Sequence, residues 1–216
     1  MNKKKIGIMG GTFDPIHKGH MMLAEYAYKC FGLDEVWFMP NGKPPHKDWD
    51  SIETTAKERL EMVRLAIKDF SEYRLEPYEV LEGYTCCTYS TMEHFKEVYP
   101  DYDFYFIIGA DSLQMLDTWV HPERIFPTCT LVATCRDDMN TPKAMEDRIR
   151  ELKEKYQEVD IRFMKTPMLP LSSSDLRKKL KDQMPVEDDI PKVVYEYIME
   201  HGLYGRKTKQ HTQGTI

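Results

Sequence analysis

The sequence predicts an α/β fold in which a doubly wound parallel sheet carries helices on both faces. Short apolar runs alternate with longer amphipathic stretches along the chain, which is the pattern of repeated β–α units. The run at residues 104–108 is continuously apolar and is followed by Gly109, as in a parallel strand that is buried on both faces. A chain of 216 residues favours one domain, which we place at residues 1–205, before a polar tail at 206–216.

The first half of the chain begins with a strand, a helix and a second strand. A helix that opens near Lys18 has apolar residues at helical spacing, and Gly32 is a suitable stop. Thr55 and Glu58 have the spacing of a capping box. In chain order we expect a strand at 6–9, a helix over 21–30, a strand at 36–39, a helix over 55–67 and a strand at 73–75.

The second half continues the alternation and ends in helices. Ser90 and Glu93 have the spacing of a helix cap, and Pro100 would stop that helix. Pro191 and Gly202 bound the last helix. In chain order we expect a helix over 90–99, strands at 104–108 and 131–134, a helix over 143–156, a strand at 161–163, and helices over 174–180 and 192–201.

The segment that follows the first predicted strand, GGTFDPIHKGH at residues 10–20, is the most informative part of the chain. Its glycines let main-chain N–H groups approach a ligand closely, and the start of the next helix adds unpaired N–H donors and a partial positive charge. Together these features predict an anion site. His17 and His20 are three positions apart, so both imidazoles can lie on one face of the helix and stabilise charge on a phosphoryl group. The alternative is a plain strand–turn–helix with surface histidines.

Other phosphate-binding motifs are missing from the sequence. It contains no GxxxxGK[ST] string, which excludes a P-loop, and no GxGxxG string, which leaves a dinucleotide-type turn unsupported. Because ligands of parallel sheets bind beyond the carboxyl ends of the strands, residues 10–20, 40–47 and 109–111 and the loop after 134 should meet along one edge.

Two strings together resemble the signatures of a known superfamily. GGTFDPIHKGH is similar to the [GT]xFDPxHxGH signature of the nucleotidyltransferases, and LSSSDLR at residues 171–177 is similar to their second signature, ISSTxIR or ISSSxVR, about 150 residues later. The resemblance implies a Rossmann-like parallel sheet and transfer of a nucleotidyl group from a nucleoside triphosphate.

The middle of the chain narrows the resemblance to the bacterial nicotinate-nucleotide adenylyltransferases. PNGKPPHK at residues 40–47 resembles their PxxxPPHK loop, YTCCT at 84–88 resembles SYTxDT, and IIGADSL at 107–113 with Trp119 resembles IIGADxL…W. The resemblance covers roughly residues 4 to 204. Gly83 and Cys87 depart from the Ser and Asp of SYTxDT, and Leu171 stands in place of an isoleucine; Arg136 is followed by two aspartates where a proline and a glycine are common.

The family's reaction joins nicotinate mononucleotide to ATP and yields nicotinate adenine dinucleotide and pyrophosphate, with Mg²⁺ accompanying ATP. The resemblance implies that His17 and His20 act on the phosphates during transfer. It implies an ATP site formed by Gly10, Gly11, Thr12, Phe13, Gly19, Gly109, Asp111, Arg136, Ser172, Ser173, Ser174 and Arg177. It implies a site for the mononucleotide formed by Asn41, Lys43, His46, Lys47, Tyr84, Thr85 and Trp119.

Several of these residues also have simpler interpretations. The serine run suits an ordinary helix N-cap, and Asp111 suits a cap before residues 112–116. The loop at 40–47 can be a solvated proline-rich turn, and Trp119 can be a core residue. Arg136 is compatible with stacking on adenine or with a phosphate contact. We expected Gly19 to leave room for the nucleotide.

Composition restricts the partners. The net charge of −6 argues against general nucleic-acid binding, and no apolar stretch is long enough for a membrane helix or a signal peptide. The five cysteines include no CxxC pair, which favours reduced thiols in a cytoplasmic enzyme. The oligomeric state stays open. The nearest rivals are the superfamily enzyme that makes dephospho-coenzyme A, which lacks the PPHK loop, and a catalytically silent nucleotide-binding module.

Overall fold

A computed structural model describes residues 3–42, 52–83, 85–134, 142–167 and 170–206. Its six strands form one sheet in the order β3-β2-β1-β4-β5-β6, and all neighbouring strands are parallel. The strands are β1 (Lys4–Gly11), β2 (Glu35–Pro40), β3 (Tyr73–Leu75), β4 (Tyr102–Gly109), β5 (Cys129–Thr134) and β6 (Ile161–Met164). The order reverses direction between β1 and β4, which creates a switch point where parallel sheets bind ligands.

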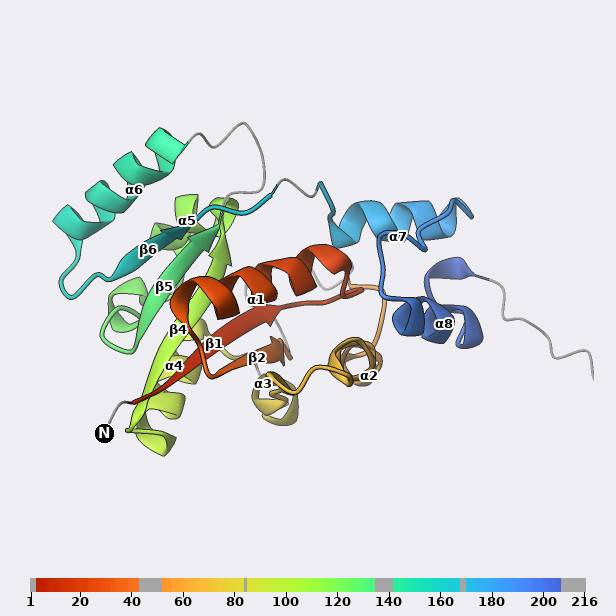
Figure 1. The fold of residues 1–216 in the computed structure, drawn as a ribbon, viewed down its shortest axis with the longest axis horizontal. Coiled ribbons are helices and arrows are strands. Elements are labelled where there is room, and N and C mark those ends of the chain that lie inside the picture. Colours follow the sequence, from red (N-terminus) through yellow and green to blue (C-terminus); the bar gives the residue numbers. More distant parts are fainter. Residues whose placement is uncertain (1–2, 43–51, 84, 135–141, 168–169, 207–216) are drawn as a thin grey trace, which may run out of the picture.

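Helices cover both faces of the sheet (Figure 1). One face packs against α1 (Lys18–Phe31) and α2 (Ala56–Ile67), and α7 (Ser173–Lys181) and α8 (Lys192–Glu200) extend the same apolar cluster past the strand ends. The other packs against α4 (Thr88–Val98), α5 (Ala110–Gln114) and α6 (Pro142–Lys155). The predicted doubly wound, Rossmann-like fold with a helical C-terminal segment is therefore confirmed.

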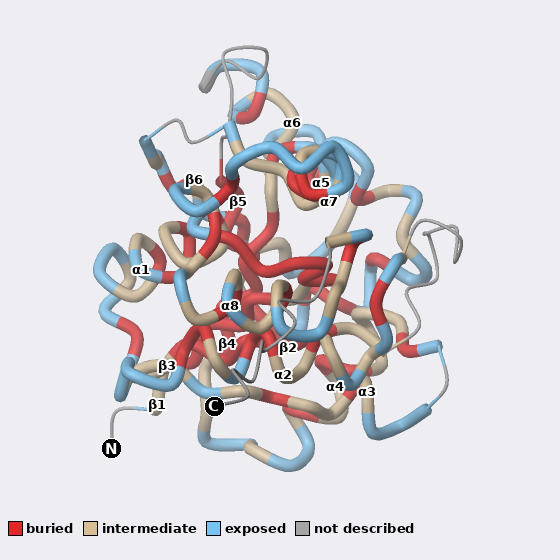
Figure 2. Tube along the Cα trace, turned by 90° about the vertical axis from the view of Figure 1, so that its right-hand side faces the viewer, coloured by how far each residue is buried: buried red, intermediate tan, exposed pale blue. Residues whose placement is uncertain are grey.

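The core consists of two apolar layers because successive strand residues point to opposite faces. In β4, Tyr105 and Ile107 join the layer under α1 and α2, whereas Phe104, Phe106 and Ile108 join the layer under α4 and α5. Strands buried on both faces need apolar residues at every position, which explains the continuous run at 104–108. Buried residues gather along these central strands (Figure 2).

The C-terminal elements lie beyond the carboxyl end of β1. In Figure 1, α7 and α8 are found past the arrowhead of β1, on the same side as α2. A short 3-10 helix, Leu203–Gly205, then returns the chain, and its Tyr204 is only 5% exposed. The C-terminal end of the described chain is thus packed against the first strand–helix connection.

All six predicted strands and all six predicted helices are present. Three helix starts were wrong. Cys87, not Ser90, is the N-cap of α4, and the Ser90 hydroxyl donates to the Cys87 carbonyl oxygen at 2.8 Å. Gly109, not Asp111, caps α5. Ser172 is the N-cap of α7, so this helix begins one residue before Ser174.

Other helix ends follow the expected chemistry. Thr55 and Glu58 form the capping box of α2, with the Glu58 amide donating to Thr55 Oγ1 at 3.2 Å and the Thr55 amide donating to Glu58 Oε2 at 2.7 Å. Gly32 ends α1 with a φ of 57°, a left-handed conformation that glycine adopts without strain. No local sequence signal predicted the short helix α3 (Tyr78–Leu81).

Candidate active site

A cleft of about 530 Å³ opens at the carboxyl ends of β1 and β4, at the switch point of the sheet. Among the described residues, most of the predicted site residues line it. They are Gly10, Gly11, Thr12, Phe13, His17, His20, Asn41, Gly109, Trp119, Ser172, Ser173, Ser174 and Arg177. The parallel sheet therefore brings together motifs that are far apart in the sequence.

The two imidazoles stack on each other at the start of α1. Their ring centroids are 3.7 Å apart with an interplanar angle of 25°. His17 is the N-cap and is 1% exposed, whereas His20 is half-buried. The His17 main-chain amide donates to His20 Nδ1 at 3.3 Å, so in neutral His20 the proton resides on Nε2. Both histidines line the cleft, as the sequence predicts for a pair that contacts the phosphates.

The structure shows a steric reason for glycine at position 19, which is the neighbouring ring of His17. A Cβ atom added at Gly19 would lie 2.9 Å from both Cε1 and Nδ1 of His17, closer than real Cβ contacts. The absent side chain therefore makes room for the His17 ring at the start of α1.

The loop between β1 and α1 holds an unusual backbone conformation. Phe13 has a φ of 52°, in the left-handed region that a bulky side chain rarely adopts. Its ring packs edge-on against His20, with centroids 5.0 Å apart. A conformation of this kind persists only where the surroundings hold it in place, and such residues often occur at ligand sites.

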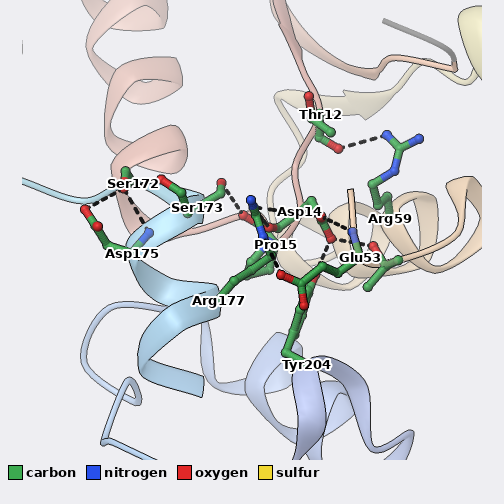
Figure 3. Close-up of polar contacts among 12 residues, drawn as sticks. Thr12, Asp14, Pro15, Glu53, Arg59, Ser172, Ser173, Asp175, Arg177 and Tyr204 are labelled. Carbon is green, nitrogen blue, oxygen red and sulfur yellow. Dashed lines mark hydrogen bonds and ion pairs between the residues drawn. The ribbon is translucent and has the colours of Figure 1, made fainter. Parts of the chain in front are cut away.

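Asp14 holds the loop on one side (Figure 3). Its carboxylate is buried and accepts hydrogen bonds from the Glu53 amide at 2.9 Å, Thr54 Oγ1 at 2.6 Å and Tyr204 Oη at 2.7 Å. Arg177 Nη1 donates to the Asp14 carbonyl oxygen at 2.7 Å. Burial, followed by the nearby Asp14 charge, raises the pKa of Tyr204 above its ordinary value. Asp14 thus joins four parts of the chain.

The second motif packs directly against the first. Ser173 Oγ donates to the Pro15 carbonyl oxygen at 3.0 Å, across 158 positions of sequence. Ser172 Oγ accepts from the Asp175 amide at 3.1 Å, as an N-cap does. Capping and cleft lining therefore coexist in the serine run, because Ser172, Ser173 and Ser174 all reach the cleft.

Arg177 lies between the cleft and two acidic residues. Besides its bond to the Asp14 carbonyl oxygen, its Nε donates to Glu53 Oε1 at 3.3 Å. Glu53 also pairs with Lys181, at 2.8 Å. The hydrogen bonds to Asp14 and Glu53 thus fix the guanidinium, and Arg177 also forms part of the cleft wall.

The far end of the cleft is aromatic. Trp119 lines it, is half-buried, and meets Phe106 edge-to-face with centroids 6.4 Å apart. Trp119 also packs against the apolar layer under α4 and α5, so it belongs both to the cleft wall and to the edge of the core. Gly109 and Ser112 line the same wall, whereas Asp111 is exposed on the first turn of α5 and does not line it.

Thr85 is exposed and is not among the residues lining the cleft, but its neighbours Cys86 and Cys87 are. Burial raises the pKa of Cys86 to about 11. Nearby Glu79 is buried, accepts a hydrogen bond from Thr91 Oγ1 at 2.8 Å, and also lines the cleft. Burial raises the pKa of Glu79 to about 7.

Some predicted site residues lie outside the described part of the chain, namely Lys43, His46, Lys47, Tyr84 and Arg136. Conversely, the buried residues Asp14, Arg59, Glu79 and Tyr204, which line or support the cleft, were not predicted as site residues. Arg59 had a recognisable signal, since it occupies an apolar position of α2 together with Met62, Val63 and Ala66, and all four are buried. Asp14 lies within the GGTFDPIHKGH segment but was not assigned a role, and Glu79 and Tyr204 had no local signal, because their roles depend on tertiary contacts.

A second hollow, about 940 Å³ in volume, lies between α2 and α8. It is more open than the cleft and is lined by residues such as Glu58, Arg64, Tyr197 and His201. None of the motif residues contributes to it, so its larger volume does not make it the candidate site.

Two features are absent from the described residues. No group of three or more His, Cys, Asp or Glu side chains is placed there to hold a metal ion. No helix in those segments has both the length and the apolar character that crossing a membrane requires.

Comparison with known proteins agrees with the resemblance seen in the sequence motifs. Residues 8–179 match the cytidylyltransferase-like family. A probable nicotinate-nucleotide adenylyltransferase of Clostridium botulinum strain Alaska E43 is 38% identical over 201 residues, which are 93% of this chain and 98% of the relative. The protein of the same description from Lachnoclostridium phytofermentans is 36% identical over 93% of this chain and 99% of its own length.

Solved structures share the fold. The nicotinic acid mononucleotide adenylyltransferase of Plasmodium falciparum, solved in complex with NaAD, superposes with a TM-score of 0.77 over 95% of this chain and 100% of that chain, at 22% identity. The same enzyme complexed with APC gives a TM-score of 0.76 over the same coverage, also at 22% identity. At this identity the similarity establishes the architecture.

Proposed function

The chain belongs to the cytidylyltransferase-like family, and from this membership we propose that it transfers AMP from ATP to nicotinate mononucleotide in NAD biosynthesis. The products are nicotinate adenine dinucleotide and pyrophosphate. The single observation that carries the proposal is the pair of stacked imidazoles, with centroids 3.7 Å apart, beside the main chain of residues 10–13 in a cleft that also contains Arg177.

The chemistry needs no nucleophile from the protein. A 5′-phosphate oxygen of the mononucleotide attacks the α-phosphorus of ATP in line, a new P–O bond forms, and the bond from the α-phosphorus to the bridging oxygen breaks as pyrophosphate leaves. Such transfers depend on positioning and on stabilising charge at the phosphoryl oxygens. The cleft offers groups of this kind: two imidazoles, main-chain amides at a helix start, and a guanidinium.

We assign His20 and His17 to the α-phosphate and the oxygens that become more charged during transfer. The main chain of Gly10, Gly11, Thr12 and Phe13 lines the phosphate path beside them. Ser172, Ser173, Ser174 and Arg177 hold the β- and γ-phosphates, and Gly109, Asp111 and Arg136 contact the adenosine. The position of Arg177, fixed by Asp14 and Glu53, supports a fixed cation at the leaving group.

The mononucleotide occupies the other end of the cleft. Its pyridine ring stacks on Trp119, which lines the cleft, and Thr85 supplies main-chain donors to the nicotinate carboxylate. Asn41, Lys43, His46, Lys47 and Tyr84 bind the remainder of the mononucleotide, including its phosphate. ATP enters as its magnesium complex, because Mg²⁺ prefers phosphate oxygens and water as ligands. We place the enzyme in the cytoplasm, where both substrates occur.

The test is an assay of pyrophosphate release from ATP and Mg²⁺ with three acceptors in parallel. Nicotinate mononucleotide should support release, and nicotinamide mononucleotide should support it much less, because an amide would present N–H groups to donors that suit a carboxylate. Phosphopantetheine should support none. Release with phosphopantetheine would indicate the coenzyme A branch, and release with no acceptor would contradict the proposal.

A further inference from the structure

Arg59 is a buried cation that lies behind the cleft. It is 1% exposed and lies in the first turns of α2. Its Nη1 donates to the carbonyl oxygens of Thr12 at 2.9 Å and Asn41 at 2.7 Å, and its Nη2 donates to that of Gly42 at 3.2 Å. Nη1 also lies 3.3 Å from Asn41 Oδ1. Figure 3 shows the guanidinium reaching the main chain at Thr12.

The carbonyls that Arg59 holds belong to the ends of two neighbouring strands. Thr12 follows β1 and Asn41 follows β2, and the two ends are also joined by the Asn41 amide, which donates to the Gly11 carbonyl oxygen at 2.9 Å. Thr12 and Asn41 line the cleft, whereas Arg59 does not. The guanidinium therefore joins the two loops from the side away from the substrates.

Peptide geometry gives this arrangement a functional consequence. In a trans peptide the carbonyl of one residue and the N–H of the next point in opposite directions. The only cis peptide among the described residues is Asp14–Pro15, so the Thr12–Phe13 peptide is trans. With the Thr12 carbonyl directed at Arg59, the Phe13 N–H is directed away from Arg59. Thr12 and Phe13 both line the cleft, whereas Arg59 does not.

We propose that Arg59 is a positioning residue, which holds the Thr12 carbonyl so that the Phe13 amide stays directed at the phosphoryl group being transferred. The inference rests on the proposed function, since it assigns that amide to the α-phosphate of ATP. It also explains how Phe13 keeps a φ of 52°: Arg59 holds the residue before it, and the buried contacts of Asp14 hold the residue after it.

The type of side chain supports a role beyond packing. Burial lowers the pKa of Arg59 from its ordinary value, while the charge of Asp14 acts in the opposite direction, and a guanidinium stays protonated in proteins. Its hydrogen bonds to described residues go to main-chain carbonyl oxygens and to Asn41 Oδ1, and none goes to a carboxylate. An apolar side chain, as at Met62 and Val63 in the same helix, would pack without this desolvation.

The test compares Arg59→Lys with Arg64→Lys in the full-length enzyme. Lysine keeps the charge but is a point donor that cannot span three carbonyls. Arg64 is exposed on the same helix and pairs with Glu61, so its variant controls for the loss of an arginine. We expect kcat of Arg59→Lys to fall about 10- to 100-fold, because small displacements of a catalytic group have effects of that size. Arg64→Lys should match the wild type.

Ligand affinities distinguish a displaced Phe13 amide from a general loosening of the binding site. AMP and adenosine differ only in the phosphate, so calorimetry with each reports on the phosphate contact. We expect Arg59→Lys to bind AMP about 10-fold more weakly while adenosine affinity stays within about 2-fold, a factor of ten being about 1.4 kcal/mol. Equal weakening of both ligands, or turnover equal to that of Arg64→Lys, would overturn the proposal.

A measurement on the wild type keeps the proposal testable if Arg59→Lys does not fold. The protein has nine phenylalanines, so [¹⁵N]phenylalanine labelling gives a simple amide spectrum, and Phe13→Leu identifies the Phe13 signal. AMP should shift this signal strongly and adenosine should not; equal shifts would refute the inference. Absence of pyrophosphate release by the wild type, with these AMP results intact, would instead refute the proposed function alone.

Discussion

At the scale of single residues, the cleft combines groups that act on the substrate with groups that hold them. His20 Nδ1 accepts a hydrogen bond from the His17 amide, which leaves Nε2 as the protonated nitrogen of the neutral ring. The absence of a side chain at Gly19 makes room for the His17 ring. The same pattern recurs at Arg177, whose guanidinium is fixed by Asp14 and Glu53. These contacts restrict the rotamers of the imidazoles and of the Arg177 guanidinium, which favours catalysis by positioning.

Replacing His20 by alanine should lower kcat by about 10²–10³, the usual effect of removing one preorganised donor to a charged transition state. Pyrophosphate release under saturating ATP and mononucleotide measures it. The fold should be retained because His20 is half-buried at the start of a helix. His201→Ala is the matched control, since His201 is exposed and lines the other hollow. Turnover of His20→Ala within a few-fold of wild type would contradict its role.

Glu79 predicts a pH dependence of stability. Burial raises its folded-state pKa to about 7, above the ordinary 4.5, so the stability that it contributes is complete below pH 4.5 and is lost as pH rises through about 7. At 1.36 kcal/mol per pH unit, the loss is on the order of 3 kcal/mol. Glu79→Gln stays uncharged and should not show this loss.

Urea unfolding of the wild type and Glu79→Gln at pH 5 and pH 8 measures this effect. The free energy of unfolding of Glu79→Gln, relative to wild type, should be higher at pH 8 than at pH 5. Glu82→Gln, at an exposed position just after the same short helix, should show no such change. An identical difference between wild type and Glu79→Gln at both pH values would mean that Glu79 ionises normally.

At the scale of elements, the strands position the loops and the C-terminal helices lock them. Tyr204, in the last short helix, reaches back 190 positions to donate to Asp14 Oδ1 at 2.7 Å, and α7 contributes Ser173 and Arg177 to the same loop. The C-terminal segment is therefore part of the site's framework, although the cleft itself lies at the strand ends.

Tyr204→Phe should destabilise the protein by about 2 kcal/mol, the typical loss for a buried hydrogen bond to a charged group. Because the change frees one side of Asp14, kcat should fall as well, by a smaller factor than in His20→Ala. Thermal unfolding and steady-state kinetics measure the two effects. Tyr197→Phe, on α8, is the control. Unchanged stability and turnover in Tyr204→Phe would show that the hydroxyl does not support the loop.

Helix starts mark the limit of what local sequence signals could predict. Thr55 and Glu58 were read correctly because their capping box is entirely local. The Ser90 prediction failed because α4 starts one turn earlier, at a cysteine that makes no side-chain cap. In α7 the sequence offers three consecutive serines as caps. In the structure Ser172 is the cap, and Ser173 instead donates to the Pro15 carbonyl oxygen.

At the scale of the whole molecule, the parallel sheet determines which distant segments meet. The strands were predictable because strands buried on both faces must be apolar at every position, and their order puts the two signature motifs on one edge. Arg59, Asp14 and Tyr204 were not predicted as site residues, since a buried polar side chain acquires its partners only when the fold is complete. The fold and most of the cleft could thus be inferred, while the supports behind it could not.

The most direct test of the account is a crystal structure with a non-hydrolysable ATP analogue that carries a methylene group between the α- and β-phosphorus atoms. The account predicts that an α-phosphate oxygen lies within about 3 Å of His20 Nε2 and of the Phe13 amide nitrogen, a normal hydrogen-bond distance. An analogue bound with its α-phosphate away from both imidazoles, or in the hollow between α2 and α8, would contradict it.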